Sequence, residues 1–78
     1  MDRKLSIRSF VLKNFFVSGD LSDDESLLDR GIIDSTCVLE IVGFLETEFK
    51  ISVLDQEMLP ENLDSIGNIA TYVERKLG

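Results

Sequence analysis

Asp34 and Ser35 stand directly before a stretch with helical periodicity, and their order suits the attachment of a phosphate group. An aspartate at this point can cap a helix, because its carboxylate accepts hydrogen bonds from the unpaired backbone N–H groups of the first turn. The hydroxyl of Ser35 then lies where these N–H groups and the helix dipole favour negative charge, so a phosphate ester on it would be stabilised. No base accompanies this hydroxyl. Ser35 is therefore interpreted as an attachment point rather than as a nucleophile.

The absence of histidine excludes several kinds of catalytic and metal site. Ser-His and Cys-His nucleophilic catalysis are excluded, as are metal sites built on imidazole. The single cysteine, Cys37, cannot form an intramolecular disulfide, and one cysteine is typical of a reducing compartment. The sequence therefore predicts a protein without catalytic activity of its own, and a small hydrolase is not expected.

An acidic run before Asp34 resembles the start of a calcium-binding loop. Asp20, Ser22 and Asp24 match the first three ligand positions of an EF-hand. Glu25 and Gly31 then stand where that loop requires glycine and glutamate, respectively. The run is therefore interpreted as a solvated acidic loop, and no metal site is expected.

The length and the charge distribution limit the kinds of partner. The 78 residues predict one domain, 1–78, and they contain no apolar run of about 18 residues that could span a membrane. No apolar signal segment is present at the N-terminus, so a cytoplasmic location is expected. The net charge is −7, and residues 18–58 carry most of the acids. We expect a monomer that binds neither nucleic acid nor membrane and that attracts enzymes with basic patches.

Apolar periodicity predicts three longer helices, and Pro60, which suits a first helical position, indicates one short helix, so the fold is expected to be all-α. The helices are expected at residues 3–17, 35–49, 60–63 and 66–77, with a long first loop at 18–34. Gly31 is expected to supply a backbone angle that other residues avoid, and Tyr72 is placed off the apolar face of the last helix. The predicted core of this four-helix bundle consists of Phe10, Val11, Phe15, Val42, Leu45, Phe49, Ile66, Ile69 and Val73.

Several segments match the pattern of one protein family. They are Asp34-Ser35, Glu40 with Ile41-Val42, the segment Leu45-Glu46-Thr47-Glu48-Phe49-Lys50-Ile51, and the segment Pro60-Glu61-Asn62-Leu63-Asp64-Ser65-Ile66. Over about its whole length the chain resembles the acyl carrier proteins, small helical domains that carry 4′-phosphopantetheine on a serine. The resemblance implies the topology of the four-helix bundle and assigns the arm to Ser35.

The family likeness also implies a function, a cofactor and partners. A phosphopantetheinyl transferase would join the arm from coenzyme A to Ser35. A ligase or synthase would then load acyl, aminoacyl or aryl groups, which the arm would carry as thioesters. The pathway would be fatty acid, polyketide or other secondary-metabolite biosynthesis. Asp34 would cap the helix and contact partners. The other residues expected to contact partner enzymes are Thr36, Glu40, Glu46, Glu48, Asp55 and Glu57.

Two departures from the family pattern leave alternatives open. Thr36 replaces the leucine that usually follows the serine, which favours dedicated partners over promiscuous recognition. Ile32-Ile33 stand where peptidyl carriers usually show a glycine pair, which counts against a typical peptide synthetase module. The alternative from another class is an unmodified acidic interaction module in which Ser35 merely caps a helix. In that case Ser35→Ala would cost about 0.5–2 kcal/mol of stability and nothing else.

Overall fold

The computed structural model describes residues 3–17, 19–34 and 36–78, and within these ranges it is all-helical, without a strand. This confirms the predicted all-α class. The two C-terminal helices begin and end at the predicted residues. The helical elements are α1 (Arg3–Asn14), α2 (Cys37–Phe49), the short 3-10 helix η1 (Asp55–Glu57), α3 (Pro60–Leu63) and α4 (Ile66–Leu77).

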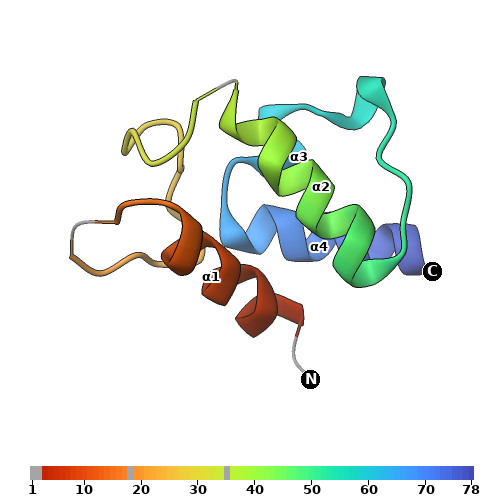
Figure 1. Cartoon of the computed structure of the whole chain (residues 1–78), viewed down its shortest axis with the longest axis horizontal. Helices are drawn as coiled ribbons and strands as arrows, with labels where there is room; N and C mark the ends of the chain where they lie inside the picture. Colours follow the sequence, from red (N-terminus) through yellow and green to blue (C-terminus); the bar gives the residue numbers. More distant parts are fainter. Residues whose placement is uncertain (1–2, 18, 35) are drawn as a thin grey trace.

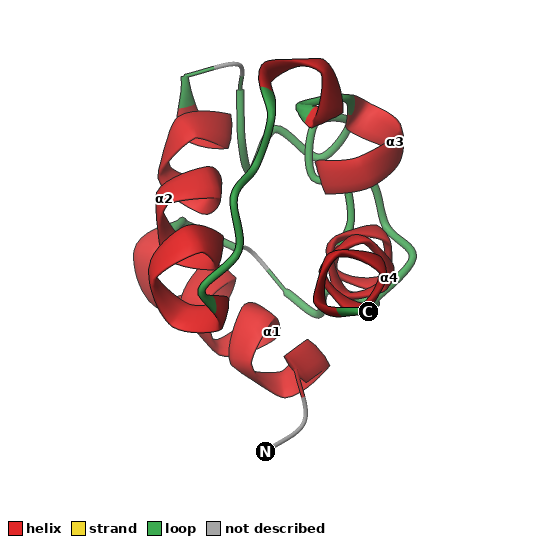
Figure 2. Cartoon of the chain, turned by 90° about the vertical axis from the view of Figure 1, so that its right-hand side faces the viewer, coloured by secondary structure: helices red, strands yellow, loops and turns green. Residues whose placement is uncertain are grey.

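The helices surround one hydrophobic core (Figure 1). Seen from the side, α2 lies opposite α3 and α4, and α1 lies beneath them (Figure 2). Both α1 and α3 pack against α4. The first loop carries the chain from the end of α1 to the start of α2, which brings the start of α2 to the end of the molecule where α3 lies (Figure 1). None of the helices in the described ranges has the length and apolar character that crossing a membrane requires.

Local sequence signals fix the limits of α4. Ser65 precedes the helix in an extended conformation, and its hydroxyl accepts a hydrogen bond from the backbone N–H of Asn68 at 3.0 Å. This is the N-cap geometry that serine favours. Arg75 and Lys76 lie in the last turn, where the helix dipole favours positive charge. The limits of this helix are therefore determined within its own segment.

The first helix is shorter than the predicted range 3–17. It ends at Asn14, whose side-chain amide donates to the carbonyl of Phe10 at 2.9 Å. Asparagine side chains compete in this way with the helical backbone, and here the competition coincides with the last turn. Phe16 therefore lies beyond the helix and is 87% exposed. The second helix begins two residues later than predicted, at Cys37, and Ser35 lies outside the described residues.

The predicted aliphatic core residues are all buried, whereas the predicted phenylalanines are only partly buried. Val11, Val42, Leu45, Ile66, Ile69 and Val73 are buried, whereas Phe10, Phe15 and Phe49 are partly buried and pack against the core. Phe10 stacks on Phe44 with ring centroids 4.1 Å apart, which joins α1 to α2. The placement of Tyr72 off the apolar face was wrong, because its side chain is only 2% exposed. The connection that contains η1 and α3 covers a second side of α4.

The first loop is tied to the helices by apolar and polar contacts. Leu21, Leu27 and Ile33 are buried in the core. Arg8 donates to the carbonyl of Leu21 at 2.6 Å and pairs with the carboxylate of Asp23. Further along, the N–H of Leu27 donates to the carbonyl of Asp64 at 2.6 Å. Gly31 has a φ of +71°, the left-handed conformation expected of it. These contacts hold the loop that delivers the chain to the start of α2.

Candidate functional site

The start of α2 is capped by Asp34. Its Oδ1 atom accepts hydrogen bonds from the backbone N–H groups of Thr36 at 2.9 Å and Cys37 at 3.0 Å. These are the second and third residues after Asp34, the positions that an N-cap side chain serves. The N–H and thiol of Cys37, together with the N–H of Thr36, hold the pKa of the Asp34 carboxyl below its ordinary value. Asp34 therefore carries a negative charge at neutral pH.

Ser35, the expected attachment point, lies outside the described residues, so the described residues next to it in the chain are considered instead. Asp34 and Thr36 are both exposed, so a large partner can reach this part of the chain. Cys37 is half-buried and begins the helix. The exposed start of a helix suits an anionic group, because unpaired N–H groups and the helix dipole favour negative charge there.

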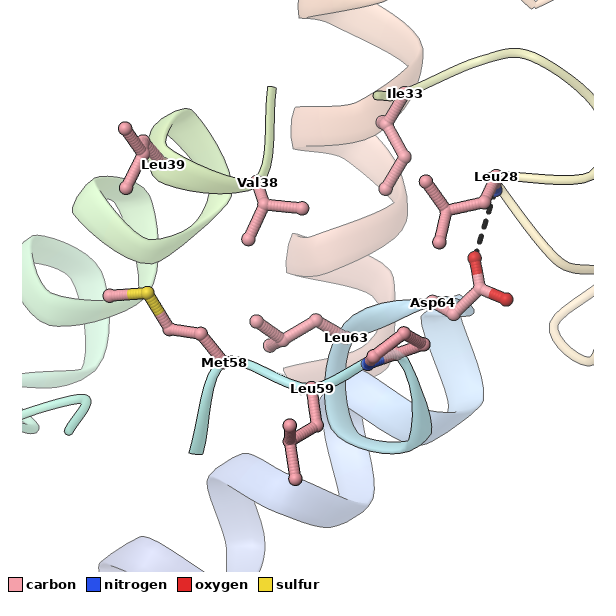
Figure 3. A pocket seen from close by; sticks show the side chains of 9 residues that line it. Leu28, Ile33, Val38, Leu39, Met58, Leu59, Leu63 and Asp64 are labelled. Carbon is pink, nitrogen blue, oxygen red and sulfur yellow. Dashed lines mark hydrogen bonds between the residues drawn. The ribbon is translucent and has the colours of Figure 1, made fainter. Parts of the chain in front are cut away.

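A pocket of about 320 Å³ lies between the start of α2 and α3 (Figure 3). Ile33 and Val38 lie in its wall, two residues before and three residues after Ser35. Met58 and Leu59, from the segment that precedes α3, also line the pocket, and in Figure 3 the Met58 side chain extends towards α2. The full set of described residues that line the pocket is Leu28, Ile33, Val38, Leu39, Met58, Leu59, Pro60, Leu63 and Asp64.

The described lining of this pocket is apolar apart from Asp64. The Oδ1 atom of Asp64 accepts a hydrogen bond from the N–H of Leu28 at 2.8 Å (Figure 3). Its Oδ2 atom accepts a hydrogen bond from the hydroxyl of Ser26. The carboxylate of Asp64 is therefore already hydrogen-bonded to the first loop. A hydrocarbon group fits such a lining, whereas a buried polar or charged group would need partners that this lining does not supply. The pocket therefore suits an apolar group.

The acidic residues expected to contact partners fall into two groups. Glu40, Glu48 and Asp55 are exposed. Glu46 is exposed as well, but its Oε2 atom accepts a hydrogen bond from the backbone N–H of Val53 at 2.9 Å, which ties α2 to the following connection. Glu57 is half-buried. The structure thus brings Asp34, Thr36 and Glu40 to the first turns of α2 and gives Glu46 and Glu57 bonds within the fold.

The carboxylate of Glu57 is the centre of a polar network. Its Oε1 atom accepts hydrogen bonds from the hydroxyl of Tyr72 at 2.9 Å, Nζ of Lys76 at 2.9 Å and the N–H of Leu54 at 3.1 Å. Lys76, Leu54 and Tyr72 together lower the pKa of Glu57 to about 2. Burial and the adjacent carboxylate raise the pKa of Tyr72 to about 12. Sequence spacing gave no signal for this network, since its members lie 15 and 19 residues apart.

This network predicts acid sensitivity of the contact between η1 and α4. The folded pKa of Glu57 is about 2, below its ordinary value of 4.5. A depressed carboxylate pKa contributes stability that is complete above the unfolded value and is lost as the pH falls towards the folded value. We therefore expect Glu57→Gln to make the unfolding free energy less dependent on pH between about 4.5 and about 2. Urea unfolding at a series of pH values measures this, with the exposed Glu61→Gln as the matched control. An equal pH dependence in wild type and Glu57→Gln would contradict the assignment.

Comparison with known proteins gives relatives from one family. No protein-family model matches the chain. An acyl carrier protein of Thermotoga maritima is 31% identical over 73 residues, which cover 92% of this chain and 88% of that protein. A probable acyl carrier protein of Serratia sp., PigG, is 30% identical over 63 residues, which cover 77% of this chain and 72% of that protein.

Proposed function

Because this chain belongs to the acyl carrier protein family, we propose that residues 1–78 form one carrier domain with a 4′-phosphopantetheine arm on Ser35. The arm would hold acyl groups as thioesters and present them to enzymes of fatty acid, polyketide or other secondary-metabolite biosynthesis. The observation that carries this proposal is the apolar pocket whose wall includes Ile33 and Val38, close to Ser35 on both sides along the chain. The domain supplies no catalytic group of its own.

The residues around Ser35 support attachment of the arm by a separate enzyme. A phosphopantetheinyl transferase would transfer the arm from coenzyme A to the hydroxyl of Ser35. Asp34 keeps its carboxylate bonded to two backbone N–H groups, so its role is to hold the start of α2 and not to take up a proton. The bound arm supplies the thiol that forms the thioester. The fold supplies the exposed helix start, which favours the negative phosphate.

The lining of the pocket favours an aliphatic acyl cargo over an aminoacyl cargo. Its described side chains are hydrocarbon or thioether except for Asp64, whose carboxylate bonds the first loop. A buried ammonium group would therefore lack a free partner, and burial of an unpaired charge is strongly unfavourable. A cargo with an apolar chain meets no such cost. The apolar lining therefore supports an aliphatic acyl cargo more than an aminoacyl or polar aryl cargo.

Partner enzymes with basic patches would dock on the acidic side of α2. Glu40, Glu48 and Asp55 are exposed, as are Asp34 and Thr36 next to the attachment point. Charges of this kind mainly accelerate encounter, and salt screens their effect. Glu46 and Glu57 remain predicted partner contacts, although either would have to release a hydrogen bond within the fold. The monomeric state, the cytoplasmic location and the absence of nucleic-acid and membrane partners remain predictions.

Reversal of one acidic charge on α2 should slow modification. We expect Glu40→Lys to lower the kcat/KM of the transferase by about tenfold at low ionic strength, because it reverses the electrostatic attraction between the two proteins. The difference should shrink as salt is added. Glu74→Lys is the matched control, since Glu74 lies on α4 and pairs only with Arg3 at 3.9 Å on the surface. Equal effects of the two variants would contradict docking on α2.

Intact-mass measurement tests the proposed function directly. The purified chain is incubated with coenzyme A, magnesium and a broad-specificity phosphopantetheinyl transferase, beside a carrier protein known to be modified. A mass gain of one phosphopantetheine supports the carrier function. No gain on the folded chain, while the control carrier is modified, would favour the unmodified interaction module.

A further inference from the structure

One wall of the apolar pocket comes from a segment that hydrophobic burial alone does not fix. Met58 and Leu59 line this wall, as Val38 of α2 and Ile33 of the first loop line another part of the pocket. In Figure 3 the Met58 side chain extends towards α2, whereas the Leu59 side chain points away from Val38 and Ile33. None of residues 54–62 is buried, whereas Val53 before them and Leu63 after them are in the core. Buried apolar residues thus anchor the segment only at its two ends, and between them Met58 packs, partly buried, against the core. The position of the rest of the segment, and with it the width of the pocket, also depends on polar contacts.

Polar bonds from Glu57 supply those contacts. Its side chain accepts from Tyr72 and Lys76 of α4, both at 2.9 Å. Its backbone carbonyl accepts from Nδ2 of Asn62 at 2.8 Å, and Oδ1 of Asn62 accepts from Arg75 of α4 at 2.9 Å. Both the side chain and the main chain of Glu57 are therefore linked to α4, directly or through one residue. We name Glu57 and its partners Tyr72, Lys76, Asn62 and Arg75 the Glu57 clamp.

The hydrogen bonds of the Glu57 clamp are expected to be strong. Hydrogen bonds between an ammonium and a carboxylate are stronger than bonds between neutral groups. Tyr72 is 2% exposed, so water competes little for its hydroxyl. Loss of the carboxylate would leave that buried hydroxyl without its acceptor, which is the costly way to break a hydrogen bond. The side chains of Glu57 and Lys76 are 26% and 24% exposed, so the clamp lies at the edge of the core.

We propose that Glu57 is a positioning residue of the carrier site, which holds Met58 and Leu59 in the pocket wall and thereby determines which acyl chains are shielded. This inference rests on the proposed function and assigns a role to Glu57 other than partner contact. Because Met58 and Leu59 directly follow Glu57 in the chain, release of its side chain frees the wall to move away from α2. A short acyl group would be little affected, whereas a longer chain would lose its cover.

Hydrogen exchange tests the clamp without an arm. We expect Glu57→Gln to raise amide exchange in residues 54–64 by about tenfold, the factor that corresponds to loss of a hydrogen bond to a charged group. The amides of Leu63 and Asp64, which bond to Leu59 and Pro60, report on α3 directly. Exchange in α2 should stay unchanged. Tyr72→Phe retains the ring and should give a smaller increase, while Glu61→Gln should give none. Unaltered exchange in both clamp variants would overturn the proposal.

Thioester protection tests the functional consequence. Wild type and variants are loaded with acetyl or octanoyl arms from the corresponding coenzyme A esters, and cleavage by hydroxylamine is followed by intact mass. We expect the octanoyl thioester of the wild type to be cleaved more slowly than the acetyl thioester. Glu57→Gln and Tyr72→Phe should reduce this ratio, with little change in acetyl cleavage. Val11→Ala, which removes buried side-chain volume from α1 and changes no described residue of the pocket lining, should leave the ratio unchanged.

The outcomes separate this inference from the proposed function. Failure to load any arm would count against the carrier function, and the exchange result would then decide the clamp by itself. Successful loading with equal octanoyl-to-acetyl ratios in wild type and clamp variants would overturn the positioning role and leave the carrier function intact. The same ratio change in Val11→Ala as in Glu57→Gln would assign the effect to general stability and would also overturn the role.

Discussion

Ser35→Ala should abolish attachment of the arm while leaving the unfolding free energy within about 0.5 kcal/mol of the wild-type value. The loss of attachment is expected because the substitution removes the only hydroxyl proposed to accept the arm. The small effect on stability is expected because Asp34 provides the capping bonds to Thr36 and Cys37. Intact mass after incubation with coenzyme A and transferase measures the first effect, and urea unfolding measures the second.

Asp34→Ala is the control for this experiment. It removes the capping carboxylate and should cost about 0.5–2 kcal/mol, the usual loss when an N-cap side chain is replaced by alanine. The interaction-module alternative makes the opposite assignment, with the stability loss on Ser35→Ala and no mass gain on either protein. A mass gain on Ser35→Ala equal to that of the wild type would show that another residue carries the arm.

Leu27→Ala should destabilise the fold by about 2–5 kcal/mol, although Leu27 lies outside every described helix. Its side chain is 0% exposed, and its N–H donates to the carbonyl of Asp64 at 2.6 Å. Truncation would leave a cavity where the first loop meets the core. Small domains have a modest total stability, of which about 2–5 kcal/mol is a large part. Urea unfolding followed by circular dichroism measures the loss.

The neighbouring residue offers a matched control for Leu27. Leu28 has the same side chain one position later but is 37% exposed, and it borders the pocket. Leu28→Ala should therefore cost clearly less stability than Leu27→Ala. Equal losses would mean that the first loop does not contribute to the core as a fixed element. Retention of wild-type stability in Leu27→Ala would contradict its burial outright.

The sequence alone predicted those features whose causes lie within a few residues of each other. The apolar stripe of α4 and the proline at the start of α3 placed these helices correctly, since helix periodicity and the fixed φ of proline are local properties. The capping role of Asp34 depends on N–H groups two and three residues away, and the angle of Gly31 depends on a single residue. Local backbone chemistry was sufficient in each case.

Two errors came from contacts that depend on more than periodicity. The first helix ended at Asn14, whose side-chain amide donates to the carbonyl of Phe10, a contact that the apolar stripe does not reveal. Tyr72 was placed outside the core because its covering segment comes from another part of the chain. Periodicity identifies which face of a helix is most apolar, but it does not show how many sides of that helix are covered.

The segment proposed to carry the arm could therefore be predicted from the sequence, whereas the pocket beside it depends on the tertiary structure. Asp34-Ser35 before an amphipathic helix and the acids on α2 could be identified from residue types and spacing. The pocket could not be identified in this way, because its described lining joins Leu28, Ile33, Val38 and Leu39 to residues of the segment 58–64. The hydrogen bonds of Glu57 within the fold could not be predicted either, because their donors, Tyr72 and Lys76, are distant in sequence. A carboxylate looks the same in a sequence whether it faces solvent or a buried hydroxyl, and only the packing of α4 against the segment before α3 distinguishes the two.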